Sequence, residues 1–214
     1  EVEEKFCELV KQDIESETYF VNLDVLPGKF RELPTKEQRE QSAEQGWENM
    51  EYMENAGVKV IHVFHQHEDF KWLKKLVDHQ EYIGISPAND ESTTSKMKWL
   101  ARCFSIVKAS RKCHGFAVTS PRMLLTYPFY SGDSTSYLRG PKYGTIPTFS
   151  GGKEKSIRYA DKENISELMR RSEYKSVDML DRKSKTGIDE GIRAFQKLET
   201  FVTDVWTKRG IIWT

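Results

Sequence analysis

The chain has 214 residues, with 33 Lys and Arg against 33 Asp and Glu, so its formal net charge is zero. A neutral chain has no overall field to draw it to nucleic acid or to an acidic membrane, so such binding needs a local patch. Aromatic residues make up 12% of it, which excludes a disordered chain, and no run reaches the ~20 apolar residues of a membrane span. Three scattered cysteines exclude a disulfide framework and favour reduced thiols in a cytoplasmic setting.

Patterns typical of strands and of helices alternate along the first two thirds of the chain. Pro27-Gly28 forms a turn after the first strand, and Asp69 and Ser120-Pro121 are typical of helix starts. Apolar residues at three- and four-residue spacings predict helices over residues 35–56, 70–77, 97–107 and 121–125. Strands are expected over residues 19–25, 58–64, 82–85, 113–118, 129–133 and 143–146. His62 shares a strand face with Phe64 and is expected to be a packed core histidine.

This alternation predicts the α/β class, with parallel strands joined by helices. An open doubly wound sheet and a (β/α)8 barrel both fit the pattern. No GxGxxG sequence follows the first strand, which counts against a dinucleotide-binding sheet. We therefore favour a TIM-like barrel over residues 1–150 that lacks its first strands in this chain.

The pattern changes from about Gly151. Residues 151–158 (GGKEKSIR) are expected to be flexible and basic, and residues 163–184 to be helical in pieces. Residues 187–208 have the spacing of an amphipathic helix, which Gly210 ends. A short strand is expected over residues 211–213. Residues 151–214 are thus predicted to be a basic linker and C-terminal helices that pack on the barrel.

Polar or ionisable residues stand beside five successive predicted strands. In a parallel barrel, functional residues gather at the carboxyl ends of the strands, so we expect these groups to share one site. They are Asn22 and Asp24, His65 to Asp69, Ser86 to Asp90, Thr119 and Ser120, and Ser131 to Thr135.

Two kinds of chemistry fit these residues. Asp133 follows the aromatic run Tyr127 to Tyr130 on a Gly-Ser turn, where Ser134 and Thr135 are expected to hydrogen-bond its carboxylate. It would then act as a nucleophile on a sugar, as in retaining glycosidases. Alternatively, His65 and His67, together with His114 and Asp133, would hold the metal ion of a hydrolase.

Four segments occur in a characteristic order: NLDV (22–25), VFHQHEDF (63–70), YIGISPAND (82–90) and HGFAVTSPRMLLTYPFYSGDSTSY (114–137). Together they resemble the tRNA-guanine transglycosylase superfamily. The resemblance covers about residues 19–147 and is closest to the queuine tRNA-ribosyltransferase-like phage and bacterial members that include DNA 7-deazaguanine transglycosylases. It implies an enzyme that replaces guanine in DNA or tRNA with a 7-deazaguanine such as preQ0, through a covalent aspartyl-glycosyl intermediate.

The resemblance also implies roles for single residues. Asp133 matches the aspartate nucleophile, and Asp24 matches the aspartate that reads the amidine edge of the purine. Gln66, or less well His65, matches a base-reading glutamine. The remaining matches are to segments that approach the base: Gly84, Ile85 and Ser86 in one, and Gly115 and Phe116 in the other.

Two features of the superfamily are absent from this sequence. The segment Asp-Ser-Gly-Ala-Phe, which supplies a second catalytic aspartate, is not found, so we expect it on further N-terminal residues or on a partner protein. The CxCxxC zinc motif is also not found, so no metal or other cofactor is expected, and the DNA-acting branch is favoured. The setting would be the cytoplasm, or the host cytoplasm for a phage protein.

A basic cluster follows the predicted nucleophile and is expected to grip the polynucleotide backbone. Its members are Arg139, Lys142, Lys153, Lys155 and Arg158. Two alternatives remain open from the residues alone. They are the metal-dependent hydrolase and a non-catalytic module that binds nucleic acid.

Overall fold

The computed structural model describes residues 4–5, 7–8, 18–25, 27–28, 34–107, 111–138, 145–158, 160–171 and 185–213. The chain divides into two compact units. The first comprises residues 1–116 and 129–131, and the second comprises residues 117–128 and 132–214.

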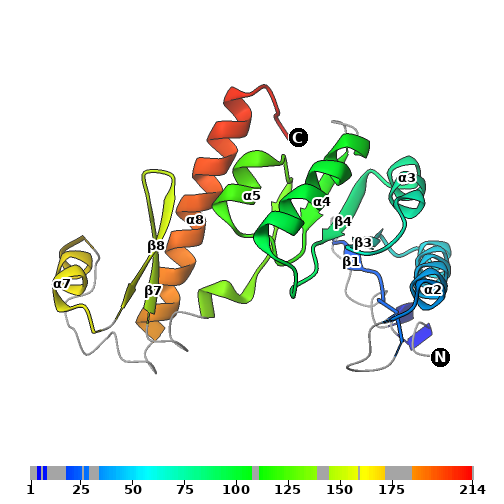
Figure 1. Cartoon of the computed structure of the whole chain (residues 1–214), viewed down its shortest axis with the longest axis horizontal. Coiled ribbons are helices and arrows are strands. Elements are labelled where there is room, and N and C mark those ends of the chain that lie inside the picture. Colours follow the sequence, from blue (N-terminus) through cyan, green and yellow to red (C-terminus); the bar gives the residue numbers. More distant parts are fainter. Residues whose placement is uncertain are drawn as a thin grey trace. The chain divides into compact units, whose positions relative to one another are not determined.

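Parallel strands form the centre of the first unit (Figure 1). They are β1 (Phe20–Val21), β2 (Val60–Ile61), β3 (Val63–His65), β4 (Tyr82–Ser86) and β5 (Lys112–Gly115). β1 pairs with β2, β3 pairs with β4, and β4 pairs with β5, all in parallel. Because β2 and β3 are separated only by His62, the order of the strands in space follows their order in the chain. β6 (Ser131–Gly132) comes next to β5 at the end of the four-stranded sheet.

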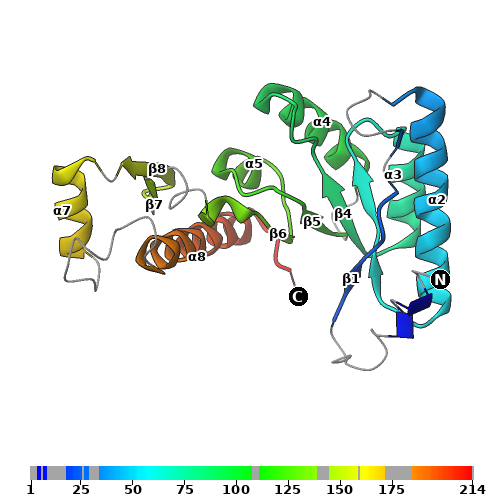
Figure 2. The same cartoon turned by 90° about the horizontal axis from the view of Figure 1, so that it is seen from below.

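Three helices connect these strands, and local sequence fixes where each begins. They are α2 (Lys36–Asn55), α3 (Phe70–His79) and α4 (Thr93–Ile106). Thr35 and Gln38 form a capping box at the start of α2. Asp69 caps α3 and Ser92 caps α4 by accepting hydrogen bonds from backbone N–H groups of the first turn. α2 and α3 lie beside each other on one side of the strands (Figure 2).

The core of the first unit lies between these helices and the strands. Met50 and Met53 of α2, Leu73 and Leu76 of α3, and Leu100 of α4 are fully buried. Burial of side chains of this size is worth about 1.5–3 kcal/mol each. The helical spacing seen in the sequence thus corresponds to the buried faces of the helices.

The second unit contains a β-hairpin where the sequence predicted a flexible linker. β7 (Thr145–Ser150) pairs antiparallel with β8 (Lys153–Arg158). Gly151 and Gly152 make the turn with φ of 58° and 77°, which glycine adopts at little cost. The prediction of a flexible stretch at 151–158 is therefore wrong for β8. The strand predicted at 143–146 is also corrected, because β7 belongs to this hairpin and not to the parallel sheet.

Four further helical segments belong to the second unit: α5 (Pro121–Thr126), the 3-10 helix η1 (Thr135–Leu138), α7 (Lys162–Arg171) and α8 (Lys185–Lys208). α8 packs against β7, with Phe201 beside Phe149 and over Gly152. The C-terminal end of α8 contacts α5, where Trp206 Nε1 donates a hydrogen bond to the carbonyl oxygen of Leu124 at 2.7 Å. The amphipathic helix is thus confirmed, whereas residues 211–213 form no strand.

The α/β class predicted from the sequence is confirmed by the parallel strands and their connecting helices. In the described part of the chain, the strands form one four-stranded and two two-stranded sheets. None of these sheets closes into a barrel.

Candidate functional site

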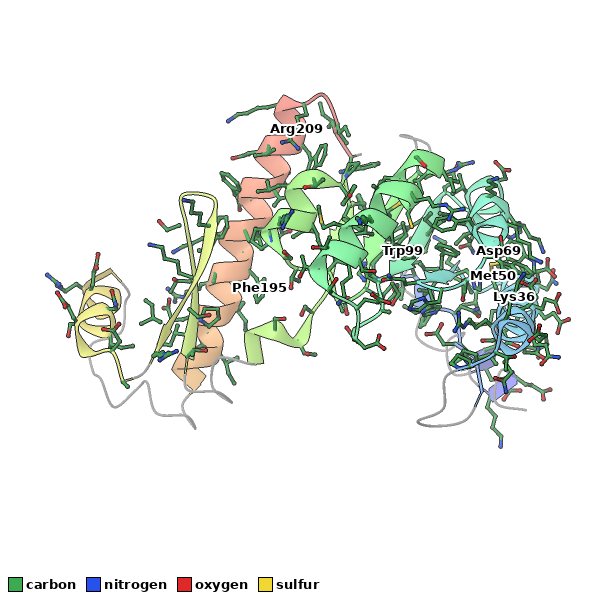
Figure 3. All side chains as sticks on the ribbon, in the orientation of Figure 1. Lys36, Met50, Asp69, Trp99, Phe195 and Arg209 are labelled. Carbon is green, nitrogen blue, oxygen red and sulfur yellow. The ribbon has the colours of Figure 1, made fainter. Side chains whose placement is uncertain are left out.

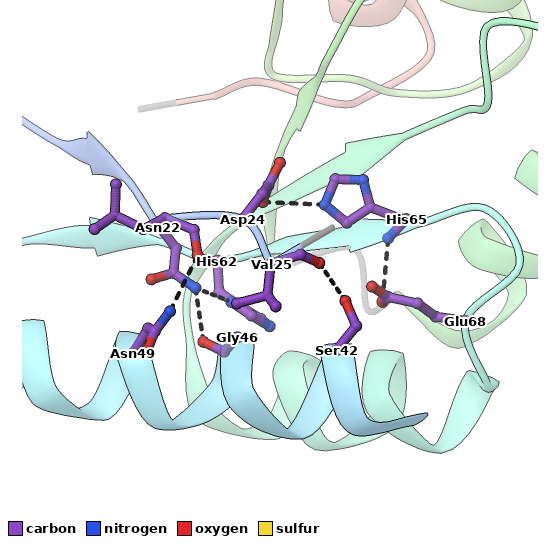
Figure 4. Close-up of polar contacts among 10 residues, drawn as sticks. Asn22, Asp24, Val25, Ser42, Gly46, Asn49, His62, His65 and Glu68 are labelled. Carbon is purple, nitrogen blue, oxygen red and sulfur yellow. Dashed lines mark hydrogen bonds and ion pairs between the residues drawn. The ribbon is translucent and has the colours of Figure 1, made fainter. Parts of the chain in front are cut away.

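An exposed ion pair lies where β1 and β3 end. The carboxylate of Asp24 is 3.1 Å from Nε2 of His65, and their side chains are 46% and 36% exposed (Figure 4). Burial by itself would lower the pKa of His65. The hydrogen bond and the charge of Asp24, with the charge of Glu68, outweigh it and raise this pKa above the usual 6.5. His65 therefore keeps its proton to a higher pH than an ordinary histidine does.

Glu68 is a titratable group of this region to which the sequence analysis gave no role. Its Oε2 accepts a hydrogen bond from the backbone N–H of His65 at 3.2 Å. Burial raises the pKa of Glu68 to about 7, although the charge of His65 acts in the opposite direction. Glu68 can thus accept or donate a proton near pH 7. The only signal in the sequence was its place in the polar run after the strand.

A second polar cluster lies inside the first unit and has a structural role (Figure 4). The amide of Asn22 donates to the carbonyl oxygen of Gly46 at 2.7 Å and contacts Nδ1 of His62 at 2.8 Å. Because the carbonyl of Gly46 can only accept, the nitrogen of this amide must face it, and His62 Nδ1 accepts the other hydrogen. Burial lowers the pKa of His62 to about 4. The prediction of a core histidine is confirmed by its 9% exposure.

Gln66 and Ser86 meet at the ends of β3 and β4. The backbone N–H of Gln66 donates to the carbonyl oxygen of Ser86 at 3.0 Å. The side-chain oxygen of Gln66 accepts from the backbone N–H of Ala88 at 3.0 Å, and its nitrogen lies 3.5 Å from the Ser95 hydroxyl. The structure therefore brings Gln66 and Ser86 together with the Asp24–His65 pair at one edge of the sheet.

Four other residues that the resemblance assigns to the base pocket lie within the sheet or against it: Gly84, Ile85, Gly115 and Phe116. The N–H of Gly84 donates to the carbonyl oxygen of His62, and the carbonyl of Ile85 accepts from the N–H of Phe116. A Cβ atom at Gly84 would lie 2.7 Å from the ring of Phe116, so this close contact requires glycine. Gly115 is buried and pairs with Ile85. The resemblance assigns backbone groups of Gly84 and Ile85 to base binding. In this structure the N–H of Gly84 and the carbonyl of Ile85 are hydrogen-bonded to other backbone groups instead.

Asp133, the predicted nucleophile, belongs to the second unit and directly follows β6. Its side chain is exposed, and Oδ1 accepts a hydrogen bond from the backbone N–H of Ala117 at 2.9 Å. Ala117 has a φ of 55°, which an alanine adopts only when its surroundings impose it. The predicted donor Ser134 instead has its hydroxyl 2.6 Å from that of Ser136. The Ala117 donor, sixteen residues away, was missed by the sequence analysis.

The histidines of the alternative metal site have other partners. His65 contacts Asp24, Nε2 of His67 lies 3.6 Å from Glu91, and Nδ1 of His114 lies 2.7 Å from the Ser131 hydroxyl. Among the residues that the structure describes, no three His, Cys, Asp or Glu side chains form a group that could hold a metal ion. The geometry therefore gives no support to the metal-dependent hydrolase.

Three of the residues predicted to bind the polynucleotide backbone lie on β8, and all three are exposed. Because side chains alternate along a strand, Lys153 and Lys155 share one face of the hairpin and Arg158 lies on the other. Arg139 and Lys142 lie outside the described residues.

No model of a known protein family matches the chain, and no curated protein matches it. In the described ranges, no helix has both the length and the apolar character needed to cross a membrane.

Proposed function

We propose that the protein is a base-exchange glycosyltransferase that replaces guanine in DNA or tRNA with a 7-deazaguanine. The observation that carries the proposal is the position of two exposed carboxylates beyond strand ends: Asp24 three residues after β1, and Asp133 directly after β6. Each is held by a defined partner, Asp24 by His65 and Asp133 by the N–H of Ala117. These are the two residues that the resemblance makes base reader and nucleophile.

In the proposed reaction, a carboxylate oxygen of Asp133 attacks C1′ of the guanosine. The bond from C1′ to N9 breaks, and guanine leaves with the bonding electrons and takes up a proton. N9 of the incoming 7-deazaguanine then loses its proton, attacks C1′ and displaces Asp133. The hydrogen bond from the N–H of Ala117 orients the carboxylate for attack.

Base reading in this proposal is the role of Asp24. A carboxylate accepts hydrogen bonds from the N1–H and amino group of a guanine edge, and Asp24 supplies such a carboxylate. Nε2 of His65 lies 3.1 Å from the carboxylate of Asp24 and fixes its position. Lys153, Lys155 and Arg158 are proposed to hold backbone phosphates.

The proposal includes a (β/α)8 barrel as the complete fold. Its support is the order of the strands, which follows the chain from β1 to β6, as it does in a singly wound barrel. A doubly wound dinucleotide-binding sheet reverses its strand order at one point. The second catalytic aspartate is proposed to come from an N-terminal segment or a partner protein, and the setting to be the cytoplasm.

The test is exchange of isotopically labelled guanine into DNA and into tRNA by the full-length protein, together with the segment or partner that supplies the second aspartate. We expect label in one of the two polymers. Asp133→Asn should abolish it, and Asp24→Asn should lower it about 30-fold or more, since losing a charged contact to the bound base costs about 2–4 kcal/mol.

Asp204→Asn is the matched control, because Asp204 is exposed on α8 of the same unit as Asp133. It should leave the exchange unchanged. Binding of polynucleotide without any exchange would favour the non-catalytic module. Exchange that survives in Asp133→Asn would contradict the proposed mechanism.

A further inference from the structure

An open cavity of about 450 Å³ lies in the first unit, at the amino ends of its helices. Cavities of this size hold small organic ligands rather than single ions. Its walls come from α2, from the loop between β3 and α3 with Phe70 of α3, and from α4 with Glu91. Figure 3 labels one residue from each of the three main walls: Lys36, Asp69 and Trp99. Neither Asp24 nor His65 lines it.

Three cations line this cavity: Lys36, Arg39 and Arg102. Within the described part of the chain, none of them forms an ion pair with a carboxylate. Arg39 donates to the carbonyl oxygen of Pro34 at 3.0 Å, and the guanidinium of Arg102 lies 3.8 Å from the centre of the Phe70 ring. These contacts orient both guanidinium groups and leave most of their N–H donors available.

The acidic residues of the cavity, by contrast, have partners within the protein. Glu40 pairs with Lys71, and Asp69 caps α3 by accepting from the N–H of Lys71. Glu91 lies 3.6 Å from His67. The fourth acidic residue of the lining, Glu68, accepts from the backbone N–H of His65, and burial raises its pKa to about 7. Each of the four thus has a partner within the protein. In the described residues, no three acidic or histidine side chains group closely enough for a metal ion.

Two neutral donors complete the lining. Gln66 is 9% exposed, and Ala88 fixes its side-chain oxygen, so its NH₂ group is the part left for a ligand. That nitrogen makes one long contact of 3.5 Å, to the hydroxyl of Ser95, which also lines the cavity. A buried NH₂ group with an unused hydrogen is costly, and an oxygen-rich ligand would satisfy it.

We propose that this cavity binds the phosphate group of a nucleotide, either free or within a polynucleotide. A phosphate offers several acceptor oxygens and up to two negative charges, which match two guanidinium groups, one ammonium group and two neutral donors. A carboxylate has only two oxygens and one charge for the same set. This inference stands on the cavity alone and does not rest on the proposed function.

The test uses calorimetric titration of the full chain with adenosine 5′-monophosphate, adenosine, inorganic phosphate, succinate and a single-stranded oligo(dA). Adenine is not the base of the proposed exchange, so the result is independent of that activity. We expect adenosine monophosphate and phosphate to bind, and adenosine and succinate not to bind. Tighter binding of oligo(dA) than of the monophosphate assigns the site to phosphates of a chain, and the reverse assigns it to a free nucleotide.

Arg39→Gln and Arg102→Gln should each raise the Kd of every phosphate ligand about tenfold or more. Lys98→Gln, an exposed position on α4 outside the cavity, should leave it unchanged. Circular dichroism checks that each variant is folded, and Lys36→Gln replaces any that is not. The proposal is overturned if no phosphate ligand binds, if adenosine or succinate binds as well as the monophosphate, or if folded cavity variants keep the wild-type Kd.

Discussion

His62 and His65 lie three residues apart, yet their surroundings move their pKa values in opposite directions. His62 is inside the first unit, where burial lowers its pKa to about 4. His65 ends β3 beside the carboxylate of Asp24, which raises its pKa above 6.5. The two histidines therefore belong to clusters with different electrostatics. The interior cluster consists of Asn22, Gly46 and His62, and the edge cluster consists of Asp24, His65 and Glu68.

The difference follows from position along the strand. The interior cluster holds neutral groups, and the NH₂ group of Asn22 donates to Gly46 and to His62 there, which adds to stability. The edge cluster lies where the strands end, where side chains reach solvent and can meet a ligand. Residue type alone does not separate the two histidines. The predictions below test this division, from the largest expected effect on stability to the smallest.

Asn22→Ala removes the donor to Gly46 and to His62 and leaves both acceptors buried. We expect it to lower the free energy of unfolding by about 3 kcal/mol, measured by urea denaturation at pH 7. Asp24→Ala is the control from the edge cluster and should cost less than about 1 kcal/mol. Equal losses in the two variants would remove the distinction between the clusters.

The low pKa of His62 also makes stability depend on pH. Between pH 6.5 and about 4 the unfolded chain binds a proton at this residue and the folded chain does not. His62 therefore makes stability fall as the pH drops through this window, by on the order of 3 kcal/mol. Unfolding measured at several pH values should show this slope in the wild type and not in His62→Gln. A His62 ring that titrates near 6.5 in NMR spectra would contradict the account.

Glu68 has the opposite pH dependence. Because its folded-state pKa is raised to about 7, the folded chain binds a proton between pH 4.5 and 7 that the unfolded chain does not. This residue therefore destabilises the fold as the pH rises through that window. Glu68→Gln mimics the protonated form and should gain about 2 kcal/mol more at pH 8 than at pH 5. Glu44→Gln, exposed on α2, should show no such difference.

The smallest expected effect on stability comes from Asp24→Asn. An exposed pair contributes little, so the free energy of unfolding should change by less than about 0.5 kcal/mol. The pKa of His65 should nevertheless fall below that of the wild type, because the charge of Asp24 is lost while the burial remains. An NMR titration of the histidine rings checks this, with Asp90→Asn as the control. An unchanged pKa of His65 would show that Asp24 does not hold its proton.

Helix starts and buried helix faces could be predicted because their causes are local. Asp69 as a cap, Pro121 at a first helical turn and the spacing of α8 are all visible within a few residues. Within α8 the pattern was less accurate, since Ile192 is exposed and Glu190 is buried. That detail depends on what packs against the helix.

The features that were missed depend on contacts distant in the sequence. β8 carries mainly Lys, Glu and Ser, so no apolar alternation predicts a strand, and its pairing with β7 and the packing of α8 on β7 hold it in the hairpin. The donor to Asp133 is sixteen residues away at Ala117. The raised pKa of Glu68 arises from the burial that folding imposes. Polar residues that follow a predicted strand indicate which side chains lie at the strand end. They do not indicate the pKa values of those side chains in the folded chain.

The central claim is that Asp133 forms a covalent bond with the sugar of its substrate. The most direct measurement is to incubate the full chain with guanine-containing DNA and tRNA, denature it, digest it and find the modified residue by mass spectrometry. The account predicts a glycosyl adduct on Asp133 that Asp133→Asn lacks and the control Asp204→Asn retains. An adduct on another residue, or one that survives in Asp133→Asn, would contradict it.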